Sequence, residues 1–447
     1  MAPRPARVSF SGGSMLRNHP GGITPSLLLA LLGYVFLLGP LEAEVRAVEP
    51  TSSAYMIEEV VALALTRHPS ISGIQGLIEQ NQGRQTAAAA YPNPTVTGYG
   101  GYGEVRDVGR ANIRDSLERE SLAEYNMTVG QPLEWPAMRA ARQRVADAGL
   151  ATAHAGLSET RLNIAAQAKI GFYDLLLAQQ DANVARQNLG IVEGVARVVK
   201  ARVKSGEGPQ FEFIKADVEV LKARQQVARA DNAVRINRVA LDTLTGGALG
   251  SSYLVKGEFI SMPKELRIET MMARMVDQHP TLQRLRQSIE QTEWKVEFER
   301  QALVPSVTIN TSYWREIGRE AVQGGLSIPL PLWYQRQGEV ASALGAKRQE
   351  EAGLLRARHE LGKAVHQHYH DARTTAELIE VFEKGLLKQA QEALRLAQFS
   401  FQQGASSLLD VLDAQRVQRQ IQMDYAQARY DLAVSLTRLD LAVGGAL

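Results

Sequence analysis

The sequence carries one structural unit twice, and this repeat limits the possible folds more than any other feature. His68-Pro69 matches His279-Pro280 at an offset of 211 residues, and Gly206 matches Gly404 at an offset of 198. Further matches follow in the same order at these two offsets, which argues against chance. We therefore expect two similar halves in tandem.

Each half reads as a helix, a pair of strands and a long helical hairpin. The halves cover 48–246 and 268–447, and the glycine-rich stretch 247–267 between them is expected to be a non-helical link. The predicted helix, strand pair and hairpin lie at 56–88, 94–133 and 137–246 in the first half and at 268–302, 305–330 and 336–443 in the second.

The helix lengths predict how the helices are arranged. The stretches 137–203 and 336–403 have no internal proline, and each would be roughly 100 Å long at 1.5 Å per residue. The returning helices cover only about half of that length. We therefore expect short helices stacked end to end beside each long one. Helix 211–246 would stack on 268–302, and the C-terminal helix on 56–88.

Three of the four strand segments alternate in polarity as half-buried strands do, and the first is glycine-rich and alternates more weakly. Tyr125, Met127 and Val129 share one parity, as do Val322 and Leu326. The predicted strands lie at 94–104, 124–133, 305–315 and 322–330. Their lengths are close to the roughly 9–11 residues that a tilted strand needs to cross a bilayer.

Four strands cannot close a membrane barrel, because the smallest such barrels have about eight. An open sheet in lipid would leave its edges unpaired. Three chains sharing one barrel would supply 12 strands. The expected fold class is thus an α+β membrane protein, in which a trimeric β-barrel with four strands per chain continues into a long α-helical barrel.

The first 47 residues look like a signal peptide. Arg4, Arg7 and Arg17 precede the uncharged run 27–41, and Val45-Arg46-Ala47 fits a cleavage site. A single membrane-spanning helix is the competing interpretation, but the run is short for the roughly 20 residues that a span requires. Translation could start at Met1 or Met15.

Composition narrows the class of function. The charges nearly balance, with 50 Lys and Arg against 48 Asp and Glu, whereas a nucleic-acid surface needs a basic excess. The absence of cysteine excludes disulfides, thiolate metal sites and cysteine nucleophiles. We find no motif for catalysis and expect neither enzymatic activity nor a cofactor.

The layout over about 55–445 resembles the TolC-like outer-membrane efflux family. The segment 408–414 (LLDVLDA) is similar to the D-V-L-D-A segment of that family. The resemblance implies that Asp410 and Asp413 line the periplasmic entrance as acidic rings, with Glu212 as their counterpart in the first half. Phe401 and Ser406 stand where some members carry a Tyr and an Arg that lock the entrance, so that lock is not expected here.

The resemblance also implies a function. It predicts a homotrimeric outer-membrane duct with a long periplasmic extension, joined to a periplasmic adaptor and an inner-membrane pump of the resistance-nodulation-division type. The tips at Gly206 and Gly404 would meet the adaptor. Tyr91-Pro92-Asn93-Pro94 resembles the heavy-metal (cobalt–zinc–cadmium) branch, so metal cations or small toxic compounds are the expected cargo, and outer-membrane lipid is the expected surrounding.

Three alternatives remain at this stage. The chain could be a periplasmic adaptor or coiled-coil scaffold, the outer component of a type I protein secretion system, or a soluble periplasmic enzyme. An adaptor would carry one hairpin rather than two, and no catalytic site supports the enzyme.

Two motifs have competing interpretations. The glycine pattern at 98–103 satisfies G-x-G-x-x-G, but no helix follows it as a dinucleotide site requires. His359, His366 and His370 fall on one helix stripe, and histidines at i and i+4 can bind a metal. A solvated helix face is the alternative interpretation.

Overall fold

The computed structural model describes residues 53–102, 123–263, 265–316 and 319–445. The predicted signal peptide, residues 1–47, lies outside the described residues. Among the described helices, none is both long enough and apolar enough to cross a membrane.

Both predicted helical hairpins are present. In the first, α4 (Pro136–Lys204) runs without interruption and α5 (Gln210–Leu244) returns beside it. In the second, α8 (Gln337–Val381) continues into α9 (Leu387–Gln402), and α10 (Leu408–Val443) returns. A short π-helical turn, η1 (Phe382–Leu386), joins α8 to α9.

The helices predicted at 56–88 and 268–302 are each broken in two, so the prediction of continuous helices is wrong. The segments are α1 (Ile57–Arg67) with α2 (Pro69–Ala89), and α6 (Ile268–Gln278) with α7 (Pro280–Gln301). Each break falls at a His-Pro pair. Proline lacks an N–H and forces the preceding residue out of the helical region, and His68 and His279 are accordingly extended, with ψ of 130° and 124°.

The predicted end-to-end stacking is also wrong in its pairing. The end of α5 lies against the break between α1 and α2, where a Cβ added at Gly246 would lie 2.7 Å from the carbonyl oxygen of Arg67. The end of α10 meets the start of α7, where His279 Nε2 lies 3.1 Å from the carbonyl oxygen of Leu441. Each short helix thus stacks on one from its own half. Length alone could not decide this, because the short helices are similar in length.

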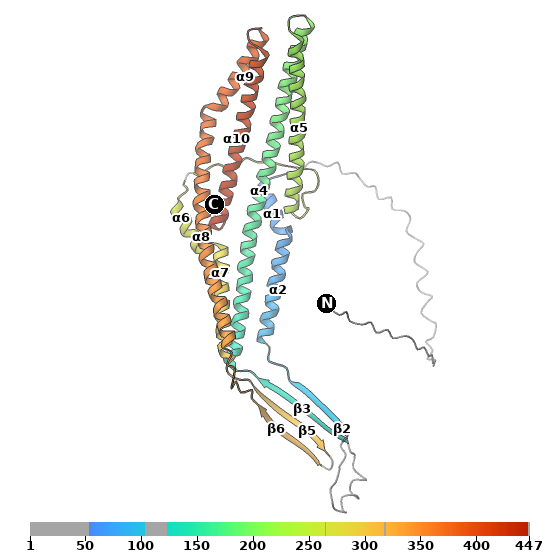
Figure 1. Cartoon of the computed structure of the whole chain (residues 1–447), viewed down its shortest axis with the longest axis vertical. Helices are drawn as coiled ribbons and strands as arrows, with labels where there is room; N and C mark the ends of the chain where they lie inside the picture. The colour runs from blue at the N-terminus through green and yellow to red at the C-terminus, as the bar shows by residue number, and fades with distance from the viewer. Residues whose placement is uncertain (1–52, 103–122, 264, 317–318, 446–447) are drawn as a thin grey trace, which may run out of the picture. The chain divides into compact units, whose positions relative to one another are not determined.

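The helices form a wall of four columns (Figure 1). The order across the wall is α5 with α2, then α4, then α10 with α7, then α8 with α9. The long helix α4 contacts both neighbours over its whole length. Glu159 of α4 pairs with Arg284 of α7, and further along Arg186 pairs with Asp231 of α5.

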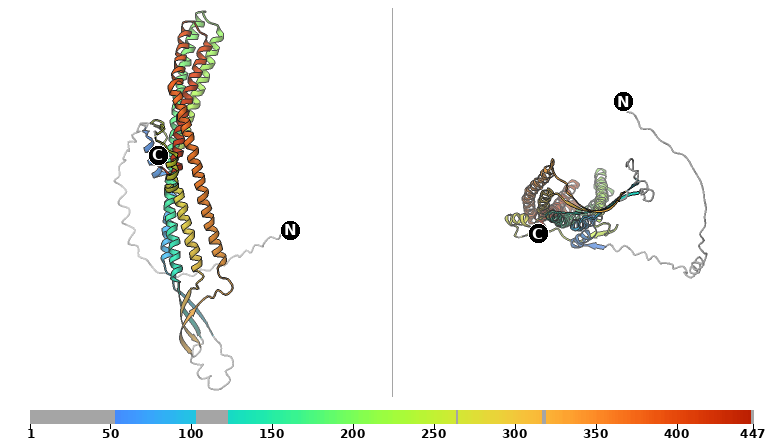
Figure 2. Two further views of the ribbon diagram at one scale, coloured as in Figure 1. Left: turned by 90° about the vertical axis from the view of Figure 1, so that its left-hand side faces the viewer. Right: turned by 90° about the horizontal axis from the view of Figure 1, so that it is seen from below.

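One antiparallel sheet continues the wall. Its strand order is β2-β3-β5-β6, which repeats the order of the helix columns, and Figure 2 shows the sheet bending as it leaves the helices. The strands are β2 (Thr95–Tyr102), β3 (Ala123–Leu133), β5 (Val307–Glu316) and β6 (Arg319–Ser327). All four strand predictions are confirmed, with small shifts at their ends.

A small feature at mid-wall was not predicted. β1 (Ser53–Tyr55) and β4 (Tyr253–Val255) pair in parallel, and the link that carries β4 covers the middle of α4. Tyr253, Phe259 and Phe172 are buried there in one apolar cluster. The predicted non-helical character of this link is confirmed for its described residues.

Candidate functional site

The hairpin tips are built by two glycines in equivalent places. Gly206 and Gly404 both have positive φ, 81° and 76°, which a residue with a side chain adopts only at a cost. The residue after each glycine donates its N–H back to the last helical turn, Glu207 to Arg202 and Ala405 to Ser400. This is the Schellman pattern of helix termination, so the predicted tip glycines shape the turns.

The two tips pack against one another. A buried apolar cluster joins the hairpins, and Phe401 is 3% exposed within it. The guanidinium of Arg202 lies 5.4 Å from the centre of the Phe401 ring. The cluster consists of Val195, Val199, Ala216, Phe401, Leu408, Val411 and Leu412. The tips therefore form one body rather than two independent loops.

Asp410 has a structural role at the start of α10. Its carboxylate accepts hydrogen bonds from the N–H and the hydroxyl of Ser407, at 2.9 Å and 2.8 Å. The Ser407 hydroxyl in turn accepts from the N–H of Asp410 at 3.3 Å, which completes a capping box. The bonds from Ser407 lower the pKa of Asp410, so it is held ionised at the helix start.

Asp413 and Glu212 are less constrained. Asp413 is exposed and pairs with Arg416 at 3.5 Å. Glu212 lies in the first turn of α5, where the cap residue is Pro209 and no side-chain cap forms. Asp410 and Asp413 are both exposed while Val411 and Leu412 between them are buried, so the two carboxylates share one face, as their spacing predicts.

The positions of the family's lock hold other contacts here. Phe401 belongs to the buried cluster between the tips, and the Ser406 hydroxyl donates to the carbonyl oxygen of Ala397 at 3.3 Å. Neither side chain offers the charged or phenolic group of a Tyr–Arg lock.

A narrow groove of about 250 Å³ lies beside the tips, between α4 and the α9–α10 pair. Its α4 side is unusually bare, because a Cβ on Gly190 would meet open space and one on Gly194 would meet only the end of Arg197. The groove is lined by Gly190, Ile191, Gly194, Val195, Val198, Gln398, Phe401, Gln402 and Val411. The sequence pattern did not predict it.

The sheet has one apolar and one polar face. The strand register puts Met127 opposite Tyr313, and Tyr313 opposite Val322, on the first face. On the second face Thr128 and Ser312 are opposite each other, and their hydroxyls are 2.8 Å apart. The predicted alternation is therefore confirmed for β3, β5 and β6.

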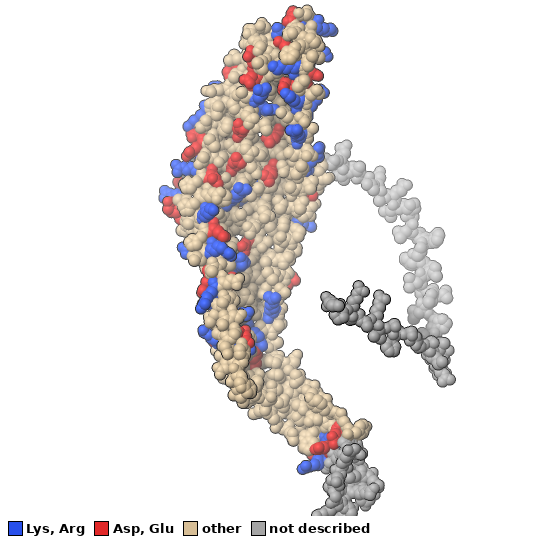
Figure 3. All heavy atoms as spheres, viewed as in Figure 1, with Lys and Arg blue, Asp and Glu red and all other residues tan. Residues whose placement is uncertain are grey.

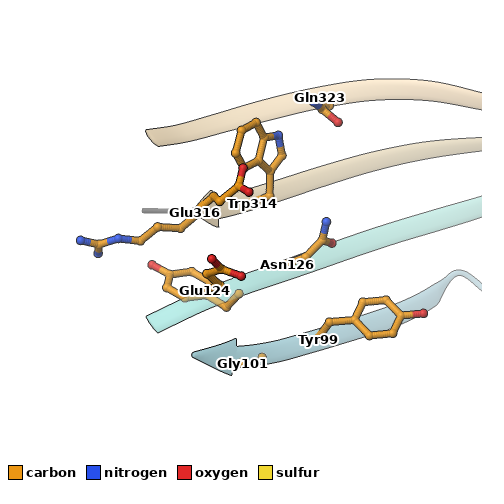
Figure 4. Close-up of a pocket in the computed structure, with 10 residues that line it drawn as sticks. Tyr99, Gly101, Glu124, Asn126, Trp314, Glu316 and Gln323 are labelled. Carbon is orange, nitrogen blue, oxygen red and sulfur yellow. The ribbon is translucent and has the colours of Figure 1, made fainter. Parts of the chain in front are cut away.

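The polar face carries a shallow groove of about 520 Å³ at the end of the sheet furthest from the helices. Figure 4 shows the two carboxylates of Glu124 and Glu316 there, with Asn126 and Gln323 further along neighbouring strands and Tyr99 on the outer strand. The groove is thus polar and acidic.

The charged residues of the four strands are confined to the end of the sheet furthest from the helices. The central parts of the strands, Tyr125–Leu133, Val307–Trp314 and Ala321–Ser327, contain no Lys, Arg, Asp or Glu, and β2 contains none at all. Figure 3 shows the resulting uncharged surface between the helices and the charged far end. At about 3.4 Å per residue, Tyr125–Leu133 extends for roughly 30 Å. The absence of charged residues from these strand segments can be read from the sequence. It is a second signal for a membrane-spanning sheet, in addition to the alternation of polarity.

The histidine stripe is partly as predicted. His366 and His370 are exposed on one face of α8, with ring centres 6.5 Å apart. Within the described parts of the chain, however, no three His, Cys, Asp or Glu side chains lie where they could hold a metal ion together.

Comparison with known proteins decides the family. The sequence profile described as "Outer membrane efflux protein" matches residues 60–247 and 273–445, which is most of both halves. The chain belongs to the outer membrane efflux protein family. The family is one of transport proteins of the outer membrane, and the helical wall is its periplasmic extension.

Proteins with similar sequences are named for different processes, one for metal resistance and one for the export of an organic compound. The cobalt-zinc-cadmium resistance protein CzcC of Cupriavidus metallidurans is 24% identical over 390 residues, covering 87% of this chain and 90% of that protein. The pyoverdine export outer membrane protein OpmQ of Pseudomonas aeruginosa is 21% identical over 355 residues, covering 76% and 73%. A crystal structure of a membrane protein from Pseudomonas aeruginosa has the same fold, with a TM-score of 0.74, 16% identity and coverage of 88% and 91%.

Proposed function

We propose that three copies of this chain, each folded from two copies of one unit, form the exit duct of a tripartite efflux system. Each chain would supply four strands to a shared barrel and four helix columns to a periplasmic tube. The observation that carries the proposal is that the sheet and the helical wall end on the same two sides. One side has β2 with α2 and α5, and the other has β6 with α8 and α9.

Both sides have unpartnered surfaces. On α5, a stripe at helical spacing is exposed, with Phe211 71% exposed and Leu221 57% exposed. On the opposite side, Val381 and Phe399 are 56% and 58% exposed. The two edge strands have unpaired backbone groups that lipid could not satisfy. Because the two sides differ, copies would associate head to tail, and such contacts close into rings.

The faces of the sheet fit a barrel wall. The apolar face with Met127, Val129 and Ile309 would contact lipid, and the polar face with Thr128 and Ser312 would line the lumen. Outer-membrane barrels carry an apolar band about 25 Å tall with aromatic girdles at both borders. Aromatic side chains border the uncharged part of the sheet in this way. Tyr102 and Tyr125 are at the far end, and Trp135 and Trp333 at the helix end.

The tips are the proposed contact for the adaptor. The groove beside Gly190 and Gly194 has room for a side chain from a partner helix. Its base is formed by residues of the buried apolar cluster between the tips. The acidic face of Asp410 and Asp413, repeated by the three chains, would form carboxylate rings of the kind that favour cations. The inner-membrane pump would be of the resistance-nodulation-division type, and we assign no catalytic role.

We propose divalent metal cations as the first class of cargo, on the strength of CzcC and the acidic tip. Small organic compounds are the second, because OpmQ is named for pyoverdine export. The adaptor and soluble-enzyme hypotheses do not fit membership of this family, whereas the type I secretion role stays open within it.

Deletion of the gene tests the function. The deletion strain should become sensitive to cobalt, zinc or cadmium and should regain resistance when the gene is supplied on a plasmid. Sensitivity to organic compounds but not to metals would indicate that the cargo is small organic compounds rather than metal cations. Unchanged sensitivity to every metal and organic compound would contradict the export function.

A further inference from the structure

We propose that His366 and His370 on α8 form a binding site for one divalent transition-metal ion. The two residues are one helical turn apart, so their side chains leave the same face of the helix. Both are exposed. Their rings are nearly parallel, with 19° between the planes and 6.5 Å between the centres.

The ring separation suits a shared ion. A zinc–nitrogen bond is about 2.0–2.1 Å long, so two imidazoles on one ion have centres roughly 4.5–6.5 Å apart, depending on the angle at the metal. The observed 6.5 Å is at the upper end of this range. Rotation of the two exposed rings about their side-chain torsions closes the gap without moving the helix.

The surroundings leave these two rings available. The only partner recorded for the pair, within the described residues, is the ring of Tyr369, which meets His370 edge-on at 5.4 Å. The nearby cation Arg373 is one turn beyond His370, and its charge is paired with Glu377 at 3.3 Å. Within the described residues, the ring nitrogens of the pair therefore have no hydrogen-bond partner, and the charge of Arg373 is balanced by Glu377.

The other histidines of this helix do not join the site. His359 is two turns from His366, which is about 10.5 Å along the axis, too far for one ion. His368 is partly buried with Nδ1 3.7 Å from Asp371 Oδ2, and its pKa is lowered by burial and by Arg438. The stripe of three histidines thus reduces to a pair, and water completes the coordination.

The chemistry of the pair sets the metal preference. Two imidazole nitrogens favour Cu²⁺ over Zn²⁺, Ni²⁺ and Co²⁺, following the Irving–Williams order. With only two protein ligands, the ion binds weakly and exchanges readily. The site consists of the chain's own side chains and does not depend on which cargo the duct exports.

The test uses the full-length protein, purified in detergent without a polyhistidine tag. Calorimetric titration with CuSO₄ and ZnCl₂ should give one ion per chain, with Cu²⁺ bound more tightly. The electron paramagnetic resonance spectrum of bound Cu²⁺ should show coupling to two imidazole nitrogens. His366→Ala and His370→Ala should each weaken binding at least tenfold, while His359→Ala and His368→Ala should stay within twofold of the parent.

Three results would overturn the site. These are no Cu²⁺ binding by the parent protein, a spectrum with a single nitrogen, or undiminished binding by the double variant His366→Ala/His370→Ala. Equal melting temperatures of parent and variants would exclude unfolding as the cause of lost binding.

Discussion

The Nε2 atom of His279 lies 3.1 Å from the carbonyl oxygen of Leu441, and this contact ties the end of α10 to the start of α7. On the other side of the same ring, Nδ1 accepts a hydrogen bond from the N–H of Thr281 at 3.1 Å and caps α7. A neutral ring with its proton on Nε2 satisfies both partners. One side chain, 3% exposed, therefore joins two helices where they meet end to end.

Replacing this ring should destabilise the helical wall. His279→Ala removes the cap, worth about 1 kcal/mol, and leaves the part-buried carbonyl of Leu441 without this partner, which costs up to about 1–3 kcal/mol. His68→Ala is the matched control, because His68 caps α2 through Ser70 in the same way but makes no hydrogen bond to a second helix among the described residues. Urea unfolding followed by circular dichroism should show the larger loss for His279→Ala. Equal losses of stability in the two variants would contradict the role of His279 in joining α10 to α7.

The same residue predicts a pH dependence. Burial lowers the pKa of His279, although the bond to Leu441 and the nearby Glu159 oppose the shift. The folded state thus favours the neutral ring, so its stabilising contribution is complete above the unfolded pKa of about 6.5 and is lost as pH falls through the folded value. Melting temperatures should fall between pH 7.5 and pH 5, and less steeply in His279→Asn. Parallel curves for parent and variant would refute this assignment.

The junction of α5 with α2 can be tested at neighbouring glycines. Gly246 and Gly247 both have positive φ, 66° and 80°, but only a Cβ on Gly246 would approach the carbonyl oxygen of Arg67, at 2.7 Å. Both alanine variants pay the backbone cost of about 1–2 kcal/mol, and Gly246→Ala adds a steric clash. Gly246→Ala should therefore unfold at clearly lower urea concentration than Gly247→Ala. The reverse order would contradict the close approach.

The two tip aspartates should separate into a structural and an electrostatic role. Asp410→Ala breaks the capping box with Ser407 and should lower the melting temperature. Asp413→Ala removes an exposed carboxylate and should leave the melting temperature unchanged while reducing cation selectivity in planar-bilayer recordings. Unchanged cation selectivity in Asp413→Ala would contradict the proposal that these carboxylates form an acidic ring.

The two faces of the sheet can be mapped because the chain has no cysteine of its own. Cysteine at Asn126 or Ser312, on the polar face, should react with a water-soluble maleimide in intact outer membranes. Cysteine at Val129 or Ile309, on the apolar face, should be protected by lipid. Equal labelling of both faces would show that the sheet does not form a barrel wall.

Much of the architecture is readable from the sequence because it follows from periodicity. The strand parity of Tyr125, Met127 and Val129 and the long proline-free stretch of α4 are local patterns, and both elements lie where they were predicted. The tip glycines Gly206 and Gly404 were equally visible, because positive φ favours glycine.

The remaining features depend on contacts between distant residues. The breaks at His68 and His279 were foreshadowed by proline, but helical spacing continues across each break and hides it. The π-turn at Phe382–Leu386 has no sequence marker that periodicity could use. The stacking of α10 on α7 involves contacts between distant residues, such as that of the His279 ring with the carbonyl group of Leu441, 162 residues along the chain, and no local pattern encodes them.

The capping role of Asp410 was missed for a different reason. The similarity of segment 408–414 to the family motif indicates a carboxylate in a lumen. Ser407, three residues before Asp410, is the residue that indicates a capping box. The acidic side chain serves the helix start whether or not it also faces the lumen.

Native mass spectrometry of the complex extracted from outer membranes tests the central claim most directly. Head-to-tail closure into one barrel of twelve strands, four from each chain, predicts a single species containing three copies. A monomer that remains in the membrane, or a species with a different number of copies, would contradict the shared barrel.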